Sequence, residues 1–201
     1  MILSILSCPY THVKGFQLQR PENLTILASM KYPFENKFPN MEKATFTASS
    51  AEVAGEVHAG SDTSFWFHVS IRADIAPVYI GDGSNIQDGS VIHVSRDIPC
   101  RVGKSVTVGH GVILHACTIG DSCLIGMGAI VLDNAEIGEQ SIVGAGALVT
   151  QNKKFPPRSL IIGSPAQAVR TLTEKEVAGI RNNAEEYIAL ARAYRSNSEN
   201  S

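Results

Sequence analysis

The sequence predicts a mainly β protein, a parallel β-helix built from hexapeptide repeats and followed by one C-terminal α-helix. Two observations lead to this prediction. Aliphatic residues recur every six positions between residues 53 and 149, and an amphipathic pattern with a capping box begins at residue 173. A period of six fits neither a helix of 3.6 residues per turn nor ordinary strand alternation, whereas three hexads complete one coil of a triangular prism.

The repeat runs through most of the chain and contains two longer steps. The steps from Ile71 to Ile80 and from Ile92 to Val102 exceed six by three and four residues, which predicts loops that protrude at corners of the prism. A glycine commonly follows the aliphatic position. The regular positions are Val53, Ala59, Phe65 and Ile71; Ile80, Ile86 and Ile92; Val102, Val108 and Leu114; and Ile119, Ile125, Val131, Ile137, Val143 and Val149.

The chain before the coils is irregular in composition. We interpret residues 1–45 as a lead-in that caps the first coil with Phe34 or Phe38, and residues 46–170 as the β-helix, because a solenoid needs capped ends. Residues 1–21 contain no acid, but no basic group precedes their apolar run, as a secretory signal requires. We therefore expect a cytoplasmic location, with an organellar leader as the alternative.

A helix is predicted over residues 171–195, with a flexible tail over 196–201. Thr173 and Glu176 have the spacing of a capping box, and apolar residues then recur at intervals of three and four. Tyr187 and Tyr194 lie on this stripe, where tyrosines most often pack against a surface. The helix is long enough to lie along the outside of the prism or against a neighbouring subunit.

Composition favours one folded domain and excludes several partners. The 201 residues are 44% hydrophobic and 18% charged, with a net charge of −2, so the chain can bury a continuous core. There is no basic run to bind nucleic acid and no apolar run near the roughly 20 residues that span a membrane. The cysteines lack metal-ligand spacing, so we expect reduced thiols: Cys8, Cys100, Cys117 and Cys123.

Counting hexads brings two histidines together. Ile71, Ile92 and Leu114 lie three hexads apart and should stack on successive coils, so the outward residues that follow them, Arg72, His93 and His115, should form one column. Neighbouring coils are about 4.8 Å apart, close enough for two imidazoles to share a metal ion.

A third histidine lies near a corner. His110 follows Val108 by two and belongs to the preceding face, one coil above Asp88. A neighbouring subunit that supplies His110 would complete the site, which predicts a cyclic homotrimer with metal between chains. We interpret the remaining histidines, His12, His58 and His68, as solvated surface residues.

Several motifs resemble the γ-class carbonic anhydrases among the left-handed β-helix proteins. They are IRAD (71–74), GDGSNIQDGSVIH (81–93), VTVGHGVILHACTIG (106–120), LIGMGAIVLDNAEIG (124–138) and GSPAQAVR (163–170). The resemblance covers residues 46–178. It implies a left-handed coil and a homotrimer whose interfaces each hold a metal, with two histidines from one chain and one from its neighbour.

The resemblance also implies a chemistry. Zn²⁺ held by His93, His110 and His115 would lower the pKa of bound water to about 7 and supply hydroxide that attacks carbon dioxide, giving bicarbonate. Such nitrogen-rich sites also accept Fe²⁺ or Co²⁺.

Four polar residues are candidates for assisting roles. Gln87 would orient the reacting oxygen, and Asn85 would help to hold carbon dioxide or bicarbonate. Arg72 would bind bicarbonate or join two subunits through Asp74. The alternatives are a corner hydrogen bond for Asn85 and a purely structural ion pair for Arg72 and Asp74.

The sequence departs from the family at the residues that carry the proton away from the active site. Glutamates that carry the proton in the best-characterised members correspond here to Ile75 and to residues 94–96, none of which is acidic. Hydroxide regeneration needs a proton carrier, so we expect hydration to be slow, dependent on buffer or absent.

Three classes of function therefore remain open. They are a metal-dependent hydratase, a hexapeptide acyltransferase that uses coenzyme A, and a metal-stabilised trimeric scaffold or binding protein. An acyltransferase needs a metal-free catalytic histidine and an extended loop over a coenzyme A groove, and neither feature is evident in the sequence. The missing glutamates favour the scaffold over a fast enzyme.

Overall fold

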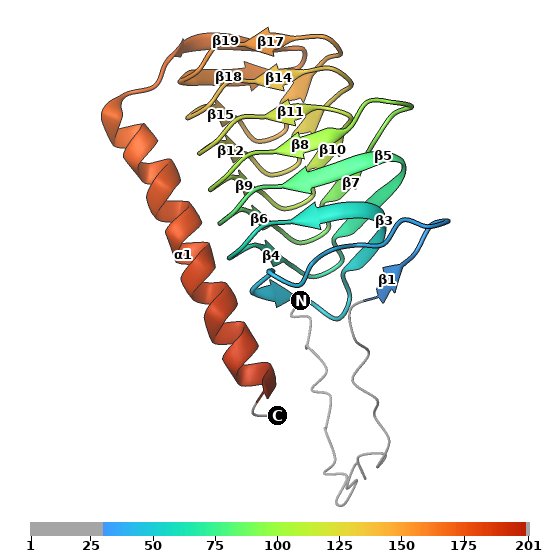
Figure 1. The fold of residues 1–201 in the computed structure, drawn as a ribbon. Helices are drawn as coiled ribbons and strands as arrows, with labels where there is room; N and C mark the ends of the chain where they lie inside the picture. The colour runs from blue at the N-terminus through green and yellow to red at the C-terminus, as the bar shows by residue number, and fades with distance from the viewer. Residues whose placement is uncertain (1–29, 200–201) are drawn as a thin grey trace, which may run out of the picture.

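The computed structural model describes residues 30–199, which form a prism of parallel β-coils with one long helix along its side (Figure 1). The coils present three faces. Strands β18 and β19 pair in antiparallel fashion and form the C-terminal end of one of these faces. Strand β1 (Met30–Tyr32) pairs with β3 beside the first coils. The predicted mainly β class, the hexapeptide β-helix and the C-terminal helix are therefore confirmed.

The strands of each face stack in parallel register. The face that we call the histidine face contains the first halves of β3 (Glu52–Ala59) and β5 (Ser70–Ile80), then β7 (Val91–His93), β10 (Ile113–His115), β13 (Ile130–Val131) and β16 (Leu148–Val149). The groove face contains the second halves of β3 and β5, then β8 (Cys100–Val102), β11 (Thr118–Ile119), β14 (Glu136–Ile137) and β17 (Lys154–Phe155). The helix face contains β2 (Phe46–Thr47), β4 (Ser64–Phe65), β6 (Asn85–Ile86), β9 (Thr107–Val108), β12 (Leu124–Ile125), β15 (Ile142–Val143), β18 (Ser159–Gly163) and β19 (Ala166–Thr171).

The six-residue period forms the core. Ile71 pairs with Ile92 and Ile92 with Leu114, as the hexad count predicts, and all three are 0–1% exposed. Burying such a side chain stabilises a fold by about 1.5–3 kcal/mol. Stacking one apolar residue per face in successive coils therefore makes the interior continuous from Val53 to Ile161.

The two corners that contain extra residues differ from each other in form. At the corner between Ile71 and Ile80 the extra residues lie within one strand, β5, instead of a separate loop. Gly55 of β3 pairs with Ala73 and Val57 with Val78, so residues 74–77 bulge out of register at this corner, as the longer step predicts. The corner before Val102 does contain a loop, closed by reciprocal backbone hydrogen bonds between Ser95 and Ile98 of 3.2 and 3.0 Å.

The lead-in caps the coils through a different residue from those predicted. Phe34 and Phe38 are 41% and 65% exposed, whereas Met41 is 4% exposed and belongs to the core cluster. Met41 follows Asn40, which is hydrogen-bonded to β3, so it reaches the open end of the first coils. Residues 1–29, which contain Cys8 and His12 and the segment considered as an alternative organellar leader, lie outside the described residues.

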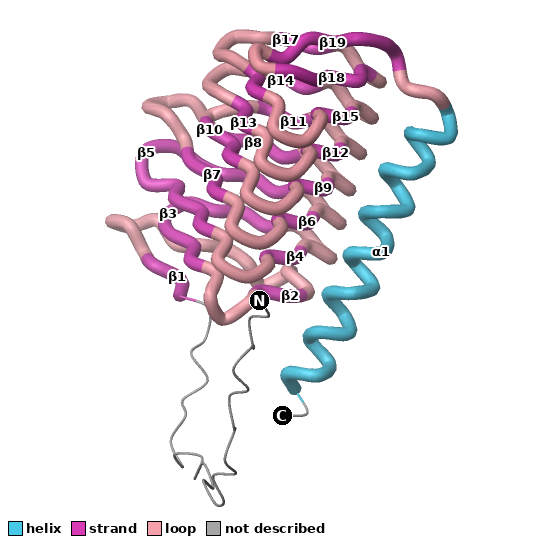
Figure 2. Tube along the Cα trace, turned by 180° about the vertical axis from the view of Figure 1, so that it is seen from behind, coloured by secondary structure: helices cyan, strands magenta, loops and turns pink. Residues whose placement is uncertain are grey.

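Helix α1 (Glu174–Glu199) lies along the helix face of its own chain (Figures 1 and 2). The capping box is present: the Glu176 amide donates to Thr173 Oγ1 at 3.3 Å and the Thr173 amide to Glu176 Oε2 at 2.9 Å. The helix continues to Glu199 instead of ending at residue 195. No helix within residues 30–199 has the length and apolar character that a bilayer span requires.

An aromatic cluster holds the far end of the helix. Tyr194 packs on Phe46 and Trp66 with ring centroids 5.3 and 5.2 Å apart, and Tyr187 meets Trp66 edge-on at 5.6 Å. The tyrosine stripe thus packs as predicted. Cys100, Cys117 and Cys123 are buried free thiols, and burial raises the pKa of Cys123 to about 12.

Candidate functional site

Two imidazoles face each other on the histidine face. Arg72 pairs in register with His93, and His93 with His115, so the predicted column is present. His93 Nδ1 lies 3.1 Å from His115 Nε2, and both side chains are half-buried. The step of one coil brings the two rings together without any loop, because equivalent positions repeat along the prism.

A carboxylate contacts the other nitrogen of each ring. His93 Nε2 lies 3.3 Å from Asp74 Oδ1, and His115 Nδ1 lies 2.5 Å from Asp133 Oδ1. An ionised carboxylate only accepts hydrogen bonds, so the nitrogens facing Asp74 and Asp133 carry the protons. The nitrogens left with lone pairs are therefore the two that point at each other.

This donor set fits a metal ion. Two lone pairs 3.1 Å apart repel each other unless a cation lies against them, and a histidine ligand usually donates its second N–H to a carboxylate. Asp74 and Asp133 supply that second contact. Neutral imidazoles suit zinc, iron and cobalt, as the sequence predicts.

The surrounding charges keep the column in the required ionisation states. Burial acts to raise the pKa of Asp74, but hydrogen bonds from Arg72 and a backbone amide, with the charge of Arg72, lower it overall. Burial, with the charge of Arg72, lowers the pKa of His93 against the opposing effect of Asp74. A neutral His93 is the form that binds a metal.

Arg72 and Asp74 form an ion pair within one chain. An Arg72 guanidinium nitrogen donates to Asp74 Oδ2, while Asp74 Oδ1 contacts His93 and accepts from the Ile75 amide at 3.0 Å. Arg72 is exposed, so its outer edge remains open to solvent.

His110 lies at a different corner, between the helix face and the histidine face. His110 Nδ1 is 2.9 Å from Asp88 Oδ2, and the Gly111 amide donates to the Asp88 carbonyl at 2.9 Å, so the two residues are stacked one coil apart as predicted. Gly111 has a φ of 65°, which a glycine adopts without steric cost, and this turn leaves His110 exposed. The contact with Asp88 leaves Nε2 of His110 free as a ligand.

Gln87 and Asn85 belong to a buried hydrogen-bond chain on the helix face. Gln87 Nε2 donates to Asn85 Oδ1 at 3.1 Å, Asn85 Nδ2 to Thr107 Oγ1 at 3.0 Å, and Thr107 to Asn183 Oδ1 of helix α1 at 2.9 Å. Gln87 points out of the prism as predicted, but it is only 4% exposed.

One cavity brings Gln87 and His110 together. It has a volume of about 400 Å³ and is also lined by Asn183 and Tyr187 of the helix. The candidate residues thus form two groups in one chain, with Arg72, Asp74, His93 and His115 on the histidine face and Asn85, Gln87 and His110 near the next corner. Residues 30–199 of a single chain contain no cluster of three or more ligating side chains suited to a metal.

Apolar side chains are exposed beside both groups. Val91 and Ile113, which pair on the histidine face, are 39% and 38% exposed. Met127, one coil above His110, is 59% exposed. Each group therefore has apolar side chains exposed beside it in a single chain.

Sequence reasoning missed three residues of these networks. Asp133 lies one residue beyond the position equivalent to His115 in the next coil, so the hexad count could have found it. Thr107 is the register partner of Asn85 and could have been found in the same way. Asn183 could not, because no repeat relates helix α1 to the coils.

The fold and these paired histidines define a hexapeptide-repeat β-helix protein with a site suited to a metal. The family model "Bacterial transferase hexapeptide (six repeats)" matches residues 116–151. A carbonic anhydrase of Geobacillus kaustophilus is 45% identical over 166 residues, which cover 83% of this chain and 91% of that protein. The chain belongs to the γ-class carbonic anhydrase family.

A second relative agrees with this assignment, and a solved structure has the same fold. The mitochondrial gamma carbonic anhydrase 1 of Arabidopsis thaliana is 40% identical over 165 residues, or 79% of this chain, although the match spans only 60% of the plant protein. A solved structure of a hexapeptide transferase family protein from Anaplasma phagocytophilum is 38% identical, with a TM-score of 0.79, and the alignment covers 83% of this chain and 98% of that one.

Proposed function

We propose that this protein is a metal-dependent carbonic anhydrase that interconverts carbon dioxide and bicarbonate at the interfaces of a homotrimer. The observation that carries the proposal is the facing of His93 Nδ1 and His115 Nε2, with Asp74 and Asp133 on the outer nitrogens. Zn²⁺ is the metal we propose, with Fe²⁺ and Co²⁺ as alternatives. The names of the relatives favour carbon dioxide as substrate.

We infer the trimer from the separation of the histidines. His110 leaves the corner with Nε2 free, and the facing pair needs a third ligand, which the partner subunit's His110 would supply. Val91, Ile113 and Met127 would then be covered by the neighbouring subunits, which removes exposed apolar surface from water. A cyclic arrangement repeats this contact three times.

Each polar residue near the site then has a role. Gln87 uses its amide nitrogen to donate to Asn85, which leaves its Oε1 available to accept a hydrogen bond from the attacking water and orient it. Asn85, Thr107 and Asn183 fix that orientation through their chain of hydrogen bonds. The exposed guanidinium of Arg72, held by Asp74, would bind bicarbonate.

A metal bound by these histidines would lower the pKa of a water molecule to about 7 and so supply the nucleophile at neutral pH. The proton released must then leave the site. Ile75 is 42% exposed beside Asp74 and cannot carry it, so buffer would take the proton directly. We therefore propose a slow, buffer-dependent enzyme. A cytoplasmic location is the one that we propose from the sequence, with an organelle as the alternative, since the related gamma carbonic anhydrase 1 of Arabidopsis thaliana is mitochondrial.

The test is metal analysis of the purified protein together with carbon dioxide hydration assays over a range of buffer concentrations. We expect about one metal ion per chain and a rate that rises with buffer. Metal without any hydration at any buffer concentration would favour the scaffold, which the absence of a glutamate at position 75 also supports. The hexapeptide acyltransferase has no observation in this chain that favours it over these two.

A further inference from the structure

The lead-in forms a hairpin that reaches the edge of the proposed metal site. Phe34 and Lys37 close this hairpin with reciprocal backbone hydrogen bonds of 3.0 Å, and we call residues 33–38 the lead-in hairpin. Lys37 Nζ donates a hydrogen bond to the carbonyl oxygen of Asp74 at 2.8 Å. The carboxylate of Asp74 contacts His93, so the lysine fixes the hairpin beside the facing histidines.

The hairpin presents a phenylalanine to solvent. Residues that pair across a two-residue turn lie on one side of the ribbon, and the next residue along the strand points to the other side. Phe34 and Lys37 therefore share the side that is turned toward Asp74, and Phe38 lies on the outer side. Phe38 is 65% exposed, more than any other large apolar side chain in the range 31–197. Aromatic side chains dominate the energetics of interfaces, so this ring is a strong anchor for a partner.

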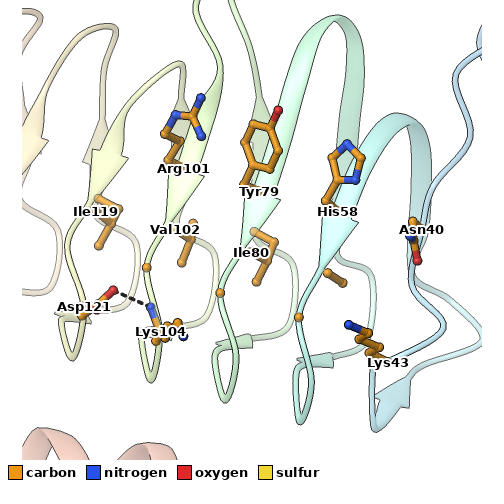
Figure 3. A pocket seen from close by; sticks show the side chains of 14 residues that line it. Asn40, Lys43, His58, Tyr79, Ile80, Arg101, Val102, Lys104, Ile119 and Asp121 are labelled. Carbon is orange, nitrogen blue, oxygen red and sulfur yellow. Dashed lines mark hydrogen bonds between the residues drawn. The ribbon is translucent and has the colours of Figure 1, made fainter.

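A column of residues on the groove face gives the height of the hairpin on the prism. Figure 3 shows Asn40, His58, Tyr79 and Arg101 on successive coils, beside a cavity of about 520 Å³. His58 stacks on Tyr79 with ring centroids 5.1 Å apart, so it is not the isolated solvated residue that we predicted. The hairpin leads directly into Asn40 and therefore begins in the lowest of these four coils, counted from the N-terminal end.

The hairpin covers the corner directly below the facing histidines. His93 precedes Arg101 in the same coil, three coils above Asn40, and Asp74 lies one coil below His93. Lys37 reaches Asp74 from the lowest coil. The outer side of the hairpin therefore lies between one and three coils below His93, on the edge of the prism that carries the pair.

The corner that carries His110 has an aromatic residue at a matching height. The Gly111 amide donates to the Asp88 carbonyl, and the Gly89 amide donates to the Phe67 carbonyl, both at 2.9 Å. These bonds join equivalent positions of successive coils. Phe67 therefore lies two coils below His110 on the same edge of the prism.

Phe67 and Tyr194 form an exposed aromatic pair. Their ring centroids are 6.1 Å apart, and they are 37% and 41% exposed. Both rings also pack on Phe46, so the cluster that anchors helix α1 holds them in place without a partner. A further ring could pack against this pair in the tilted or offset arrangements that aromatic side chains prefer.

The two surfaces match in height if three chains form a ring. Around an axis parallel to the prism, each coil lies at the height of the same coil in its neighbours. The partner subunit's His110 would then approach the site near the coils of His93 and His115. Two coils lower, the partner subunit's Phe67 would face the outer side of the lead-in hairpin.

We propose that the lead-in hairpin is an arm that docks Phe38 on the partner subunit's Phe67 and the partner's Tyr194. The proposal rests on the proposed homotrimer, whose metal site is incomplete without the partner's His110. Docking removes three exposed aromatic rings from water at each interface. Through Lys37, the same arm holds the backbone of Asp74 beside the metal site.

Cross-linking tests the contact. A variant with Phe38→Cys and Phe67→Cys, made in a Cys8→Ser background, should be converted by a short bismaleimide into covalent trimers that denaturing electrophoresis resolves. The two positions lie at opposite edges of the histidine face in one chain, so a link between them joins two subunits. The remaining cysteines are buried and protected from the reagent: Cys100, Cys117 and Cys123.

Ala145 provides the matched control. It is exposed in the same corner column as Phe67 but four coils higher, about 19 Å away. Phe38→Cys combined with Ala145→Cys should therefore give no covalent trimer. Equal cross-linking of the two pairs would overturn the proposal, because it would show contact without the expected register.

Sedimentation separates this proposal from the proposed function. A monomeric wild type would overturn the trimer and the docking together, whereas a trimeric wild type whose Phe38–Phe67 cysteine variant gives no cross-link would overturn the docking alone. Phe38→Ser should raise the protein concentration at which half of the trimer dissociates by at least about 10-fold, because each interface loses a buried phenylalanine. Circular dichroism checks that this variant is folded. Unchanged dissociation of folded Phe38→Ser would contradict the assignment.

Discussion

His93 Nδ1 and His115 Nε2 lie 3.1 Å apart, while Asp74 and Asp133 contact the opposite edges of the two rings. Each contact specifies a tautomer. An ionised carboxylate only accepts hydrogen bonds, so the ring nitrogen that faces it carries the proton. The pair thus presents two lone pairs to one point. The coil spacing places the rings, and the aspartates determine which nitrogen of each is free.

Metal removal should destabilise the protein. A ligand that binds only the folded state adds RT ln(1 + [L]/Kd) to its stability, about 2.7 kcal/mol at a free metal concentration of 100 Kd. We expect a chelator to lower the melting temperature of the wild type and to have no effect on His115→Ala. The measurement is thermal melting with metal analysis of the same samples. A wild type that melts at the same temperature with and without chelator would count against a metal at this pair.

Mixing two inactive variants tests the shared site. Neither His110→Ala nor His93→Ala alone can form a complete set of three histidines. Each mixed trimer, however, contains one interface with His93 and His115 from one chain and His110 from the other. Random mixing of equal amounts should therefore restore about a quarter of the wild-type metal content.

The matched control is a mixture of His93→Ala and His115→Ala chains. Both substitutions affect ligands from the same side of the interface, so no arrangement of these chains completes a site. Metal binding that returns equally in both mixtures, or in neither, would be inconsistent with His110 coming from the partner.

Asp133 should strengthen metal binding without contacting the metal. Asp133→Asn keeps the shape of the side chain but removes the charge that holds the His115 N–H. We expect a 10- to 100-fold loss of metal affinity, the range typical of such outer contacts, measured by competition with a chelator. Glu185→Gln on helix α1 removes an exposed charge elsewhere and should not alter the affinity.

Asn183 should affect the hydration rate without affecting metal occupancy. Asn183→Ala leaves the buried Thr107 hydroxyl without its acceptor, which costs about 1–3 kcal/mol and loosens the chain that orients Gln87. We expect a lower kcat at full metal occupancy, as for Gln87→Ala. Asn182→Ala, the exposed neighbour on the same helix, is the control. Loss of metal from Asn183→Ala or Gln87→Ala would show that the two groups of residues are not separate in function.

Much of this arrangement could be predicted because a repeat converts sequence distance into spatial distance. The stacking of Arg72, His93 and His115, and of Asp88 and His110, followed from counting hexads. Contacts outside the repeat did not follow. The Asn183 contact depends on how helix α1 lies against the prism, and Met41 replaces Phe34 and Phe38 as the cap because an irregular segment has no period to count. The extra residues after Ile71 were predicted from the longer step, but the count could not show that they bulge within one strand whose two halves pair with β3 on either side of the corner.

Proton transfer provides the last prediction, at the position where this chain departs from its family. Ile75 is 42% exposed, and its amide is hydrogen-bonded to Asp74, the carboxylate that contacts His93. A glutamate at this position would place an ionisable group at the solvent edge of the site. Ile75→Glu should therefore raise the hydration rate in weak buffer, with a gain no larger than the roughly 10²- to 10⁴-fold typical of a positioned acid or base.

Ile75→Gln is the control for this substitution, because it has nearly the same shape and cannot carry a proton. Imidazole buffer should accelerate the wild type and Ile75→Gln much more than Ile75→Glu, since only the glutamate variant has its own proton carrier. Isotope exchange between carbon dioxide and bicarbonate at equilibrium should differ little among the three proteins, because this exchange does not require the proton to leave. A wild-type rate that is already high and indifferent to buffer would mean that another residue carries the proton, and Tyr187, which lines the cavity with Gln87 and His110, would be the first to replace by phenylalanine.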